Sequence, residues 1–129
     1  MSYKYFQSSK KKHASDCSVR CIMAAEGLDW KTAFGKLVET AYKEMDIPND
    51  SGVIEKTIKK MGYEKRKAEM IQTAFGKKRR LSVSEFAKRH KKGTFILSLT
   101  GHVVCVKNGH WYDTWDCGEY KVFKYWEKV

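Results

Sequence analysis

Residues 101–116 read GHVVCVKNGHWYDTWD, and this stretch decides the fold. Two runs of β-branched and aromatic residues flank Asn108-Gly109, the dipeptide most typical of a two-residue type I′ hairpin turn. Such a turn pairs Lys107 with His110, and the side chains then alternate between the two faces of the hairpin. The residues predicted to share one face are His102, Val104, Val106, Trp111, Asp113 and Trp115.

A histidine and an aspartate are the two ionisable residues on this predicted face. In this register Val104 lies opposite Asp113, and His102 lies opposite Trp115. His102 and Asp113 are then diagonal neighbours, close enough for the carboxylate to orient the imidazole. Asp116 points to the other face, so the register selects Asp113 as the orienting acid.

The rest of the chain extends this hairpin into an α+β fold. Strands are predicted over residues 94–99, 102–107, 110–115 and 119–126, where β-branched and aromatic residues are frequent. Helices are predicted over residues 17–28, from residue 30 onward, over 53–61 and over 83–91, with Ser15 or Asp16 as the first N-cap and a Ser82–Glu85 capping box. We expect one domain over residues 1–129, with N-terminal helices packed on one face of a C-terminal antiparallel sheet.

The chain is strongly basic, with a formal net charge of +11 over 129 residues. The charge is concentrated at Lys10–Lys12, Lys65–Lys67, Lys77–Arg80 and Lys88–Lys92. Such a surface attracts nucleic acid, an anionic cell wall or an acidic protein partner, or serves solubility alone. We find no signal peptide and no apolar run that could span a bilayer, and therefore expect a cytoplasmic protein without a membrane partner.

Cys17 is the candidate nucleophile among four cysteines. Without a secretion signal the cysteines are expected to be free thiols, and no C-x-x-C pair indicates a zinc site, so we expect no metal and no cofactor. Cys17 falls in the opening turn of the first predicted helix, where unpaired N–H groups favour a thiolate. Cys21 lies one turn further in and is predicted to belong to the core.

The order of these residues resembles that of papain-like cysteine peptidases. In that superfamily a cysteine at a helix start is followed by a histidine at a strand start and by an Asn-Ser-Trp motif on the next strand. Asp113-Thr114-Trp115 is similar to a carboxylate version of that motif, with Trp115 shielding the triad. Small phage and bacterial proteins with DC-x-x-R near the start and GH-x-V…DTWD near the end look most similar.

This resemblance implies a thiol hydrolase with a Cys17–His102–Asp113 triad that acts on a peptide or isopeptide bond. It also implies an oxyanion-hole glutamine, for which Gln7 is the candidate, with Ser15 and the backbone of Cys17 as substitutes. Residues 63–80 are read as an exposed loop or a short strand, and residues 63–92 are expected to line or cover one side of the cleft.

Two other functions fit the sequence. The first is a peptidoglycan amidase or endopeptidase of a phage lysis system, because a positive surface suits an anionic wall. The second is a non-catalytic basic module that binds nucleic acid or a host protein, in which Cys17 and His102 are ordinary core residues. No recognised nucleic-acid-binding motif is present in the sequence.

Overall fold

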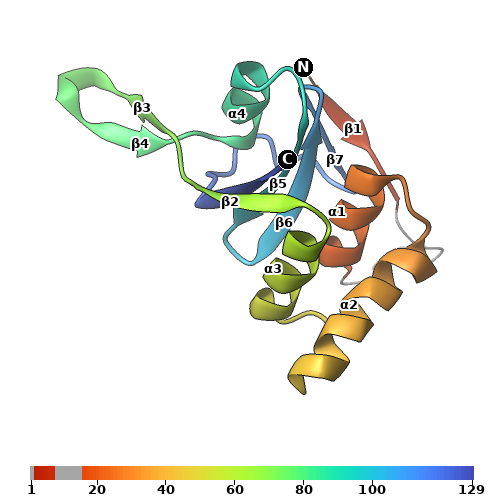
Figure 1. The fold of residues 1–129 in the computed structure, drawn as a ribbon. Coiled ribbons are helices and arrows are strands. Elements are labelled where there is room, and N and C mark those ends of the chain that lie inside the picture. The colour runs from red at the N-terminus through yellow and green to blue at the C-terminus, as the bar shows by residue number, and fades with distance from the viewer. Residues whose placement is uncertain (1, 8–15) are drawn as a thin grey trace.

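The computed structural model describes residues 2–7 and 16–129, so Lys10–Lys12 and Ser15 lie outside the described residues. Its main sheet contains β1 (Tyr3–Tyr5), β2 (Tyr63–Lys67), β5 (Thr94–Leu99), β6 (His102–Lys107), β7 (His110–Asp113) and β8 (Lys124–Lys128). The helices are α1 (Cys17–Glu26), α2 (Trp30–Glu44), α3 (Ser51–Lys60) and α4 (Val83–Arg89). The sheet order is β1-β7-β6-β5-β8-β2, which confirms the α+β class (Figure 1).

The two faces of the sheet carry separate apolar clusters. On one face α1, α2 and α3 pack on Ile96, Cys105 and Trp126. On the other face α4 packs on Phe95 and its neighbours, because alternate residues of β5 point to opposite sides. The prediction that the helices cover one face is therefore correct for the first three helices and wrong for α4.

The central hairpin forms as its turn chemistry predicts. Asn108 and Gly109 have φ values of 52° and 81°, as a type I′ turn requires, and Lys107 pairs with His110. The β6–β7 ladder continues to the pair Cys105–Tyr112. β7 ends at Asp113, whose carboxylate accepts a hydrogen bond from the Thr114 N–H at 2.8 Å and turns the chain. The predicted pairs Val104–Asp113 and His102–Trp115 are therefore not part of the ladder.

The last predicted strand is shifted along the chain. Residues 119–123 were expected to be part of it, but β8 begins at Lys124. The backbone N–H of Val122 instead donates to Leu81 O at 2.9 Å, and the Val83 N–H donates to Tyr120 O at 2.9 Å. This segment therefore pairs with the residues that lead into α4.

β1 was not predicted. It is a three-residue strand, and it lies parallel to β7 with Tyr5 beside Asp113, so the sheet is not wholly antiparallel. Parallel pairing between the ends of the chain leaves no local sequence signal. β1 brings the N-terminal segment to the edge of the sheet that carries Asp113.

Helix starts follow their capping residues. The Asp29 side chain accepts a hydrogen bond from the Thr32 N–H at 2.7 Å at the start of α2. At α4, Ser82 and Glu85 form the predicted capping box. Among the described residues, no helix is long and apolar enough to cross a membrane.

Residues 63–80 contain more structure than expected. Tyr63–Lys67 is the edge strand β2 of the main sheet, antiparallel to β8. Strands β3 (Met70–Gln72) and β4 (Lys78–Arg80) pair with each other and project from the body of the molecule (Figure 1). We call residues 70–80 the arm.

Candidate active site

Cys17 is the first residue of α1. The first backbone hydrogen bond of the helix runs from the Arg20 N–H to Asp16 O at 2.8 Å, so the N–H groups before Arg20 have no intrahelical acceptor. Asp16 occupies the N-cap position, yet its side chain makes no capping hydrogen bond. Among the described residues, the N–H groups of this first turn are placed to stabilise a thiolate or an oxyanion beside Cys17.

His102 joins Cys17 to Asp113. The His102 Nε2 atom lies 2.5 Å from Asp113 Oδ2, a short charge-assisted hydrogen bond between a half-buried ring and a buried carboxylate. Because Nε2–H is donated to Asp113, Nδ1 is the nitrogen left for the hydrogen bond with the Cys17 thiol. The structure thus brings the three predicted triad residues together.

The electrostatic surroundings favour an ion pair at this site. Burial of Cys17 opposes its ionisation, but the hydrogen bonds from His102 and the Val103 N–H outweigh it, and the pKa of the thiol is below its ordinary value of 9.0. Burial also opposes the charge on His102, yet Asp113 and Cys17 raise the pKa of the imidazole to about 9. Both shifts favour a thiolate–imidazolium pair over a neutral thiol and imidazole.

The other three cysteines lack this environment. Cys21, Cys105 and Cys117 are buried, with at most 1% of their surface exposed. Burial raises the pKa of Cys105 and of Cys117 to about 12, and it raises the pKa of Cys21 well above the ordinary value. Cys17 is half-buried and is the cysteine suited to act as a nucleophile.

Asp113 is held by more partners than the sequence indicated. Arg20 Nε donates to its Oδ1 atom at 3.1 Å, and the Cys117 thiol lies 3.7 Å from its Oδ2 atom. Its backbone carbonyl accepts hydrogen bonds from the Tyr3 hydroxyl at 3.0 Å and from the Phe6 N–H at 2.8 Å. Burial would raise the pKa of Asp113, but His102 and the other donors keep it below its ordinary value.

Arg20 also links the triad to the base of α1. Its Nη1 atom donates to Asp16 Oδ1 at 2.7 Å, and Trp30 Nε1 donates to the second Asp16 oxygen at 2.9 Å. The Arg20 side chain is only 8% exposed and lies between two carboxylates. Sequence reasoning gave Arg20 no role, although it ends the DC-x-x-R motif and stands four residues after Asp16 on a helix.

Trp115 lies beside the triad, as the resemblance implied. Its ring centroid is 5.1 Å from that of His102, and its outer side contacts Tyr120 edge-on at 5.1 Å. The Trp115 side chain is 39% exposed and so forms a wall between the imidazole and solvent. The ring is thus placed where the resemblance predicts a residue that shields the hydrogen bond between His102 and Asp113.

Gln7 reaches the same end of the sheet. It follows β1 by two residues, and the preceding residue, Phe6, donates its N–H to the Asp113 carbonyl. Gln7 is half-buried and has interactions of its own. The backbone path therefore carries the predicted oxyanion-hole residue to the level of Asp113.

A cleft of about 350 Å³ opens beside the reactive thiol. Its lining residues are Cys17, Asn49, Ser51, Ile54, Ser98, Leu99, Gly101, His102 and Val103. They come from α1, the start of α3 and the β5–β6 turn. Within the described part of the chain none lies in residues 63–92, so the expectation that this segment lines the cleft is wrong.

Asn49 is a cleft residue that the sequence did not single out. Its Oδ1 atom accepts a hydrogen bond from the Ser18 hydroxyl at 3.0 Å, and Ser18 directly follows Cys17. Its oxygen is engaged, and among the described residues no hydrogen bond uses its two N–H donors, which can be offered to a ligand. A single asparagine in a loop carries no sequence signal for this role.

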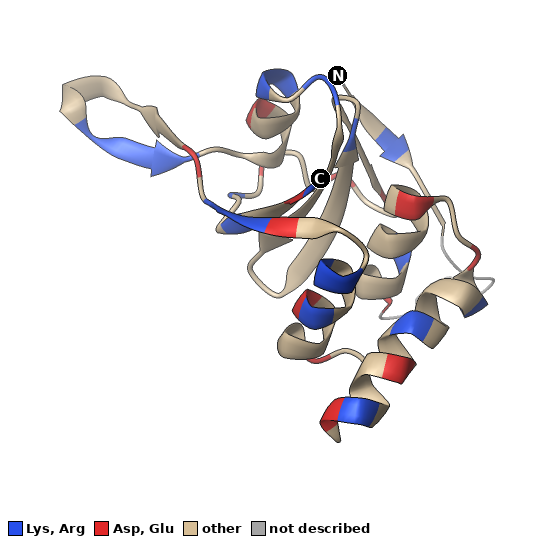
Figure 2. Cartoon of the chain, in the orientation of Figure 1, with Lys and Arg blue, Asp and Glu red and all other residues tan. Residues whose placement is uncertain are grey.

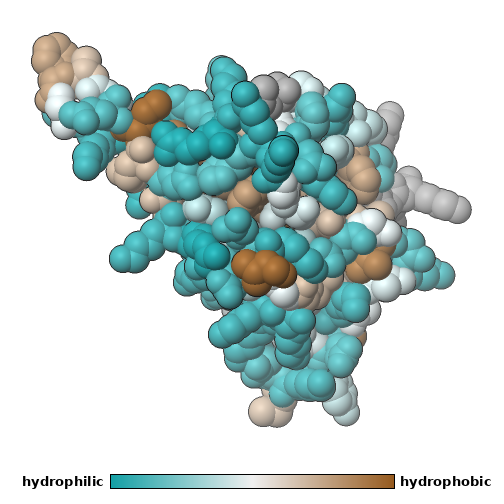
Figure 3. All heavy atoms as spheres, turned by 45° about the horizontal axis from the view of Figure 1, so that its top comes forward, coloured by the Kyte–Doolittle hydropathy of each residue, from teal (hydrophilic) through white to brown (hydrophobic). Residues whose placement is uncertain are grey.

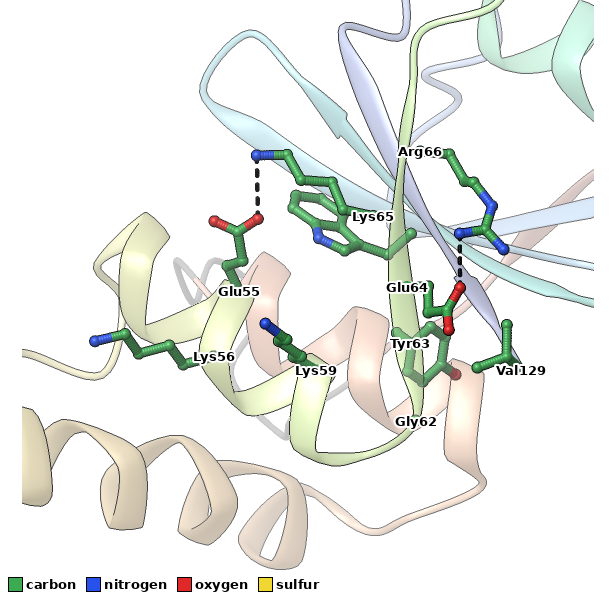
Figure 4. Close-up of a pocket in the computed structure, with 10 residues that line it drawn as sticks. Glu55, Lys56, Lys59, Gly62, Tyr63, Glu64, Lys65, Arg66 and Val129 are labelled. Carbon is green, nitrogen blue, oxygen red and sulfur yellow. Dashed lines mark hydrogen bonds and ion pairs between the residues drawn. The ribbon is translucent and has the colours of Figure 1, made fainter.

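A larger cavity, of about 810 Å³, lies between α3 and β2 and is lined by Trp126 (Figure 4). Two of its cations are neutralised, because Lys65 pairs with Glu55 at 3.3 Å and Arg66 pairs with Glu64 at 2.9 Å. No triad residue lines it. Its size alone therefore does not make it the reactive site.

His102, Asp113 and Cys117 are close enough to be tested as a metal site, since their ligand atoms lie within 4.8 Å of one another. The Nε2–Oδ2 distance of 2.5 Å is a hydrogen-bond length, shorter than the roughly 3.4 Å between two ligands of a tetrahedral zinc ion. The Arg20 guanidinium on the same carboxylate further disfavours a cation. The group fits a hydrogen-bonded triad better than a metal centre.

No protein-family model, curated protein or solved structure matches this chain.

Proposed function

We propose that this protein is a cysteine-dependent hydrolase with a papain-like arrangement, acting on peptide or isopeptide bonds in the cytoplasm. The observation that carries the proposal is the chain of contacts Cys17–His102–Asp113, with a thiol pKa held below its ordinary value. A lowered thiol pKa beside a histidine and an open helix N-terminus is the environment of a nucleophilic cysteine.

In the proposed reaction the Cys17 thiolate attacks the carbonyl carbon of the substrate bound in the cleft. The new C–S bond pushes the carbonyl electrons onto oxygen, and the N–H groups at the start of α1 stabilise that oxyanion. The imidazolium of His102 gives its proton to the leaving amine as the C–N bond breaks. A thioester acyl-enzyme and a free amine result.

Water completes the proposed cycle. Neutral His102 removes a proton from the incoming water, whose oxygen attacks the thioester carbonyl. The C–S bond then breaks, which releases the acid and restores the thiolate. Asp113 keeps the proton of Nε2 in place, so that Nδ1 faces the reacting atoms throughout.

The first test is the rate of Cys17 alkylation by iodoacetamide between pH 4 and pH 9, with the modified cysteine identified by mass spectrometry. We expect Cys17 alone to react well below pH 8. His102→Ala should slow this reaction at least about tenfold, because the thiol loses the imidazole that lowers its pKa and a smaller fraction of it is thiolate.

Cys21→Ser is the matched control, since it removes a buried thiol from the same helix and leaves the triad intact. The control should label at the wild-type rate. Should Cys17 react no faster than Cys105 or Cys117, and only above pH 8, the nucleophile assignment is wrong. If Cys17 is labelled as fast in His102→Ala as in the wild type, His102 is not part of the mechanism.

A further inference from the structure

A basic groove of about 550 Å³ lies at the base of the arm. It is formed at the β8–β2 edge of the sheet, whereas β1 forms the other edge. It is lined by residues 65–68, Met70, Arg80, Phe123 and Lys124. Five of these residues are cations, and in the described part of the chain no carboxylate is among the lining residues. Figure 2 shows the same concentration of Lys and Arg along β4 and the end of β2.

Three of the groove cations have no neutralising partner. Lys67, Arg80 and Lys124 form no ion pair with any described residue, unlike Lys65 and Arg66, which pair with glutamates. Unpaired cations that share a concave surface reinforce one another's potential. The groove therefore attracts a polyanion more strongly than the larger cavity between α3 and β2.

The groove also offers an aromatic face. Phe123 is 43% exposed, and the Arg80 guanidinium lies 4.9 Å from its ring centroid. An exposed ring with an arginine over it is a surface on which a nucleobase stacks. Met70, the first residue of the arm, is 44% exposed and adds a second apolar side chain to the lining of the groove.

The outer end of the arm carries a second aromatic residue. Phe75 is 99% exposed, and its φ of 66° is a left-handed conformation that a side chain with a Cβ rarely adopts. Figure 3 shows apolar side chains gathered at this end of the arm, on a face that is otherwise largely hydrophilic. Lys77 and Lys78 follow directly and are exposed.

The arm is fixed to the body at its base. Arg79 makes a two-pronged hydrogen bond to Glu85 of α4, with both N–O distances at 2.8 Å. Glu69 accepts hydrogen bonds from the Tyr125 hydroxyl at 2.8 Å and from His90. The base of the arm is therefore held beside the groove, and Phe75 follows Met70 of the groove lining by five residues, a reach of at most roughly 17 Å.

We propose that the basic groove and the arm bind single-stranded nucleic acid, with phosphates on Lys67, Arg80 and Lys124 and bases stacked on Phe123 and Phe75. A single strand carries phosphates for the cations and unpaired bases for the two exposed rings, whereas a bilayer surface offers no base to stack. Stacking on a π-face and salt-dependent phosphate contacts are the two elements of such binding. The inference does not depend on the Cys17 triad.

Fluorescence anisotropy with labelled oligothymidylates of 5 and 15 nucleotides tests this proposal at 50 and 200 mM NaCl. Lys67→Ala/Arg80→Ala should weaken binding of the 15-mer at least about tenfold and reduce the slope of log K against log salt by about 1.4. Phe123→Ala should weaken both oligonucleotides about tenfold, through loss of one stacked base. Phe75→Ala should weaken the 15-mer more than the 5-mer, because the longer strand can fill the groove and reach the tip of the arm at the same time.

Lys31→Ala/Lys36→Ala is the matched control, since it removes two exposed positive charges from α2. It should change the affinity less than about twofold. An equal loss in this control, or no loss in either aromatic variant, overturns the proposal in favour of general charge attraction. The proposal is also overturned if a mixed-sequence 20-base-pair duplex binds as tightly as the 15-mer. The same holds if vesicles containing phosphatidylserine bind more tightly than the 15-mer and this binding depends on Lys67 and Arg80.

Discussion

Arg20 and Asp113 are 93 residues apart in the chain, yet the arginine Nε lies 3.1 Å from the aspartate Oδ1. The other oxygen of the same carboxylate receives His102 Nε2 at 2.5 Å. One carboxylate thus joins α1, which carries the proposed nucleophile, to β6, which carries the proposed base. The distance from Cys17 to His102 is set through this connection as well as by helix packing.

Replacing Arg20 by Met should destabilise the protein strongly. Asp16 and Asp113 would lose the cation between them and would remain buried, at 7% and 1% exposure. Removing one partner of a buried ion pair costs about 3–5 kcal/mol of unfolding free energy. Urea denaturation of Arg20→Met and of the wild type measures this loss. Lys43→Met breaks the exposed Lys43–Glu39 pair and should cost at most about 0.5 kcal/mol. A loss below about 1 kcal/mol for Arg20→Met would mean that Arg20 does not hold the site together.

The pH dependence of hydrolysis should be bell-shaped. Activity rises as Cys17 ionises, below the ordinary thiol pKa of 9.0, and falls as His102 loses its proton near pH 9. Asp113→Asn removes the carboxylate that raises the imidazole pKa, so the alkaline limb should move to lower pH. The profile of kcat/KM for a nitrophenyl ester measures both limbs. An alkaline limb that stays in place in Asp113→Asn would show that Asp113 does not set the pKa of His102.

Local chemistry explains why the hairpin could be predicted from the sequence. The Asn108-Gly109 turn fixes the register of β6 and β7, and the register brings His102 and Asp113 near one another. Cys17 was identifiable because Ser15 and Asp16 are typical N-cap residues and predict a helix that starts at the cysteine. α1 does begin at Cys17, although the Asp16 side chain makes no capping hydrogen bond. These signals lie within a few residues of the structure they determine.

The parts that escaped prediction depend on distant partners. β1 pairs in parallel with a strand more than a hundred residues later, and Arg20 meets Asp113 only once the sheet has formed. Residues 119–123 have strand-like composition, but the backbone around Leu81 competes for their hydrogen bonds. Tertiary context overrides local propensity in each case.

The oxyanion donor can be identified by comparing two amide side chains. Asn49 lines the cleft with Cys17, whereas Gln7 is placed near Asp113 by its backbone path. We expect Asn49→Ala to reduce kcat about a hundredfold with little change in KM, the effect of losing one oxyanion donor. Asn49→Asp keeps the acceptor for Ser18 but loses the donor, and should lose as much activity. Full activity in Asn49→Ala together with a large loss in Gln7→Ala would assign the role to Gln7.

The arm should depend on Arg79 for its attachment to α4. Arg79→Met removes both hydrogen bonds to Glu85 but leaves the Ser82–Glu85 capping box in place. Trypsin cleavage after Lys77 and Lys78 should accelerate about fivefold, which corresponds to about 1 kcal/mol of local opening free energy. The global unfolding free energy should change by less than about 0.5 kcal/mol, because the broken pair is partly exposed. Lys43→Met is the charge-matched control and should be cleaved at the wild-type rate. If Arg79→Met is also cleaved at that rate, the contacts of Glu69 hold the arm without Arg79.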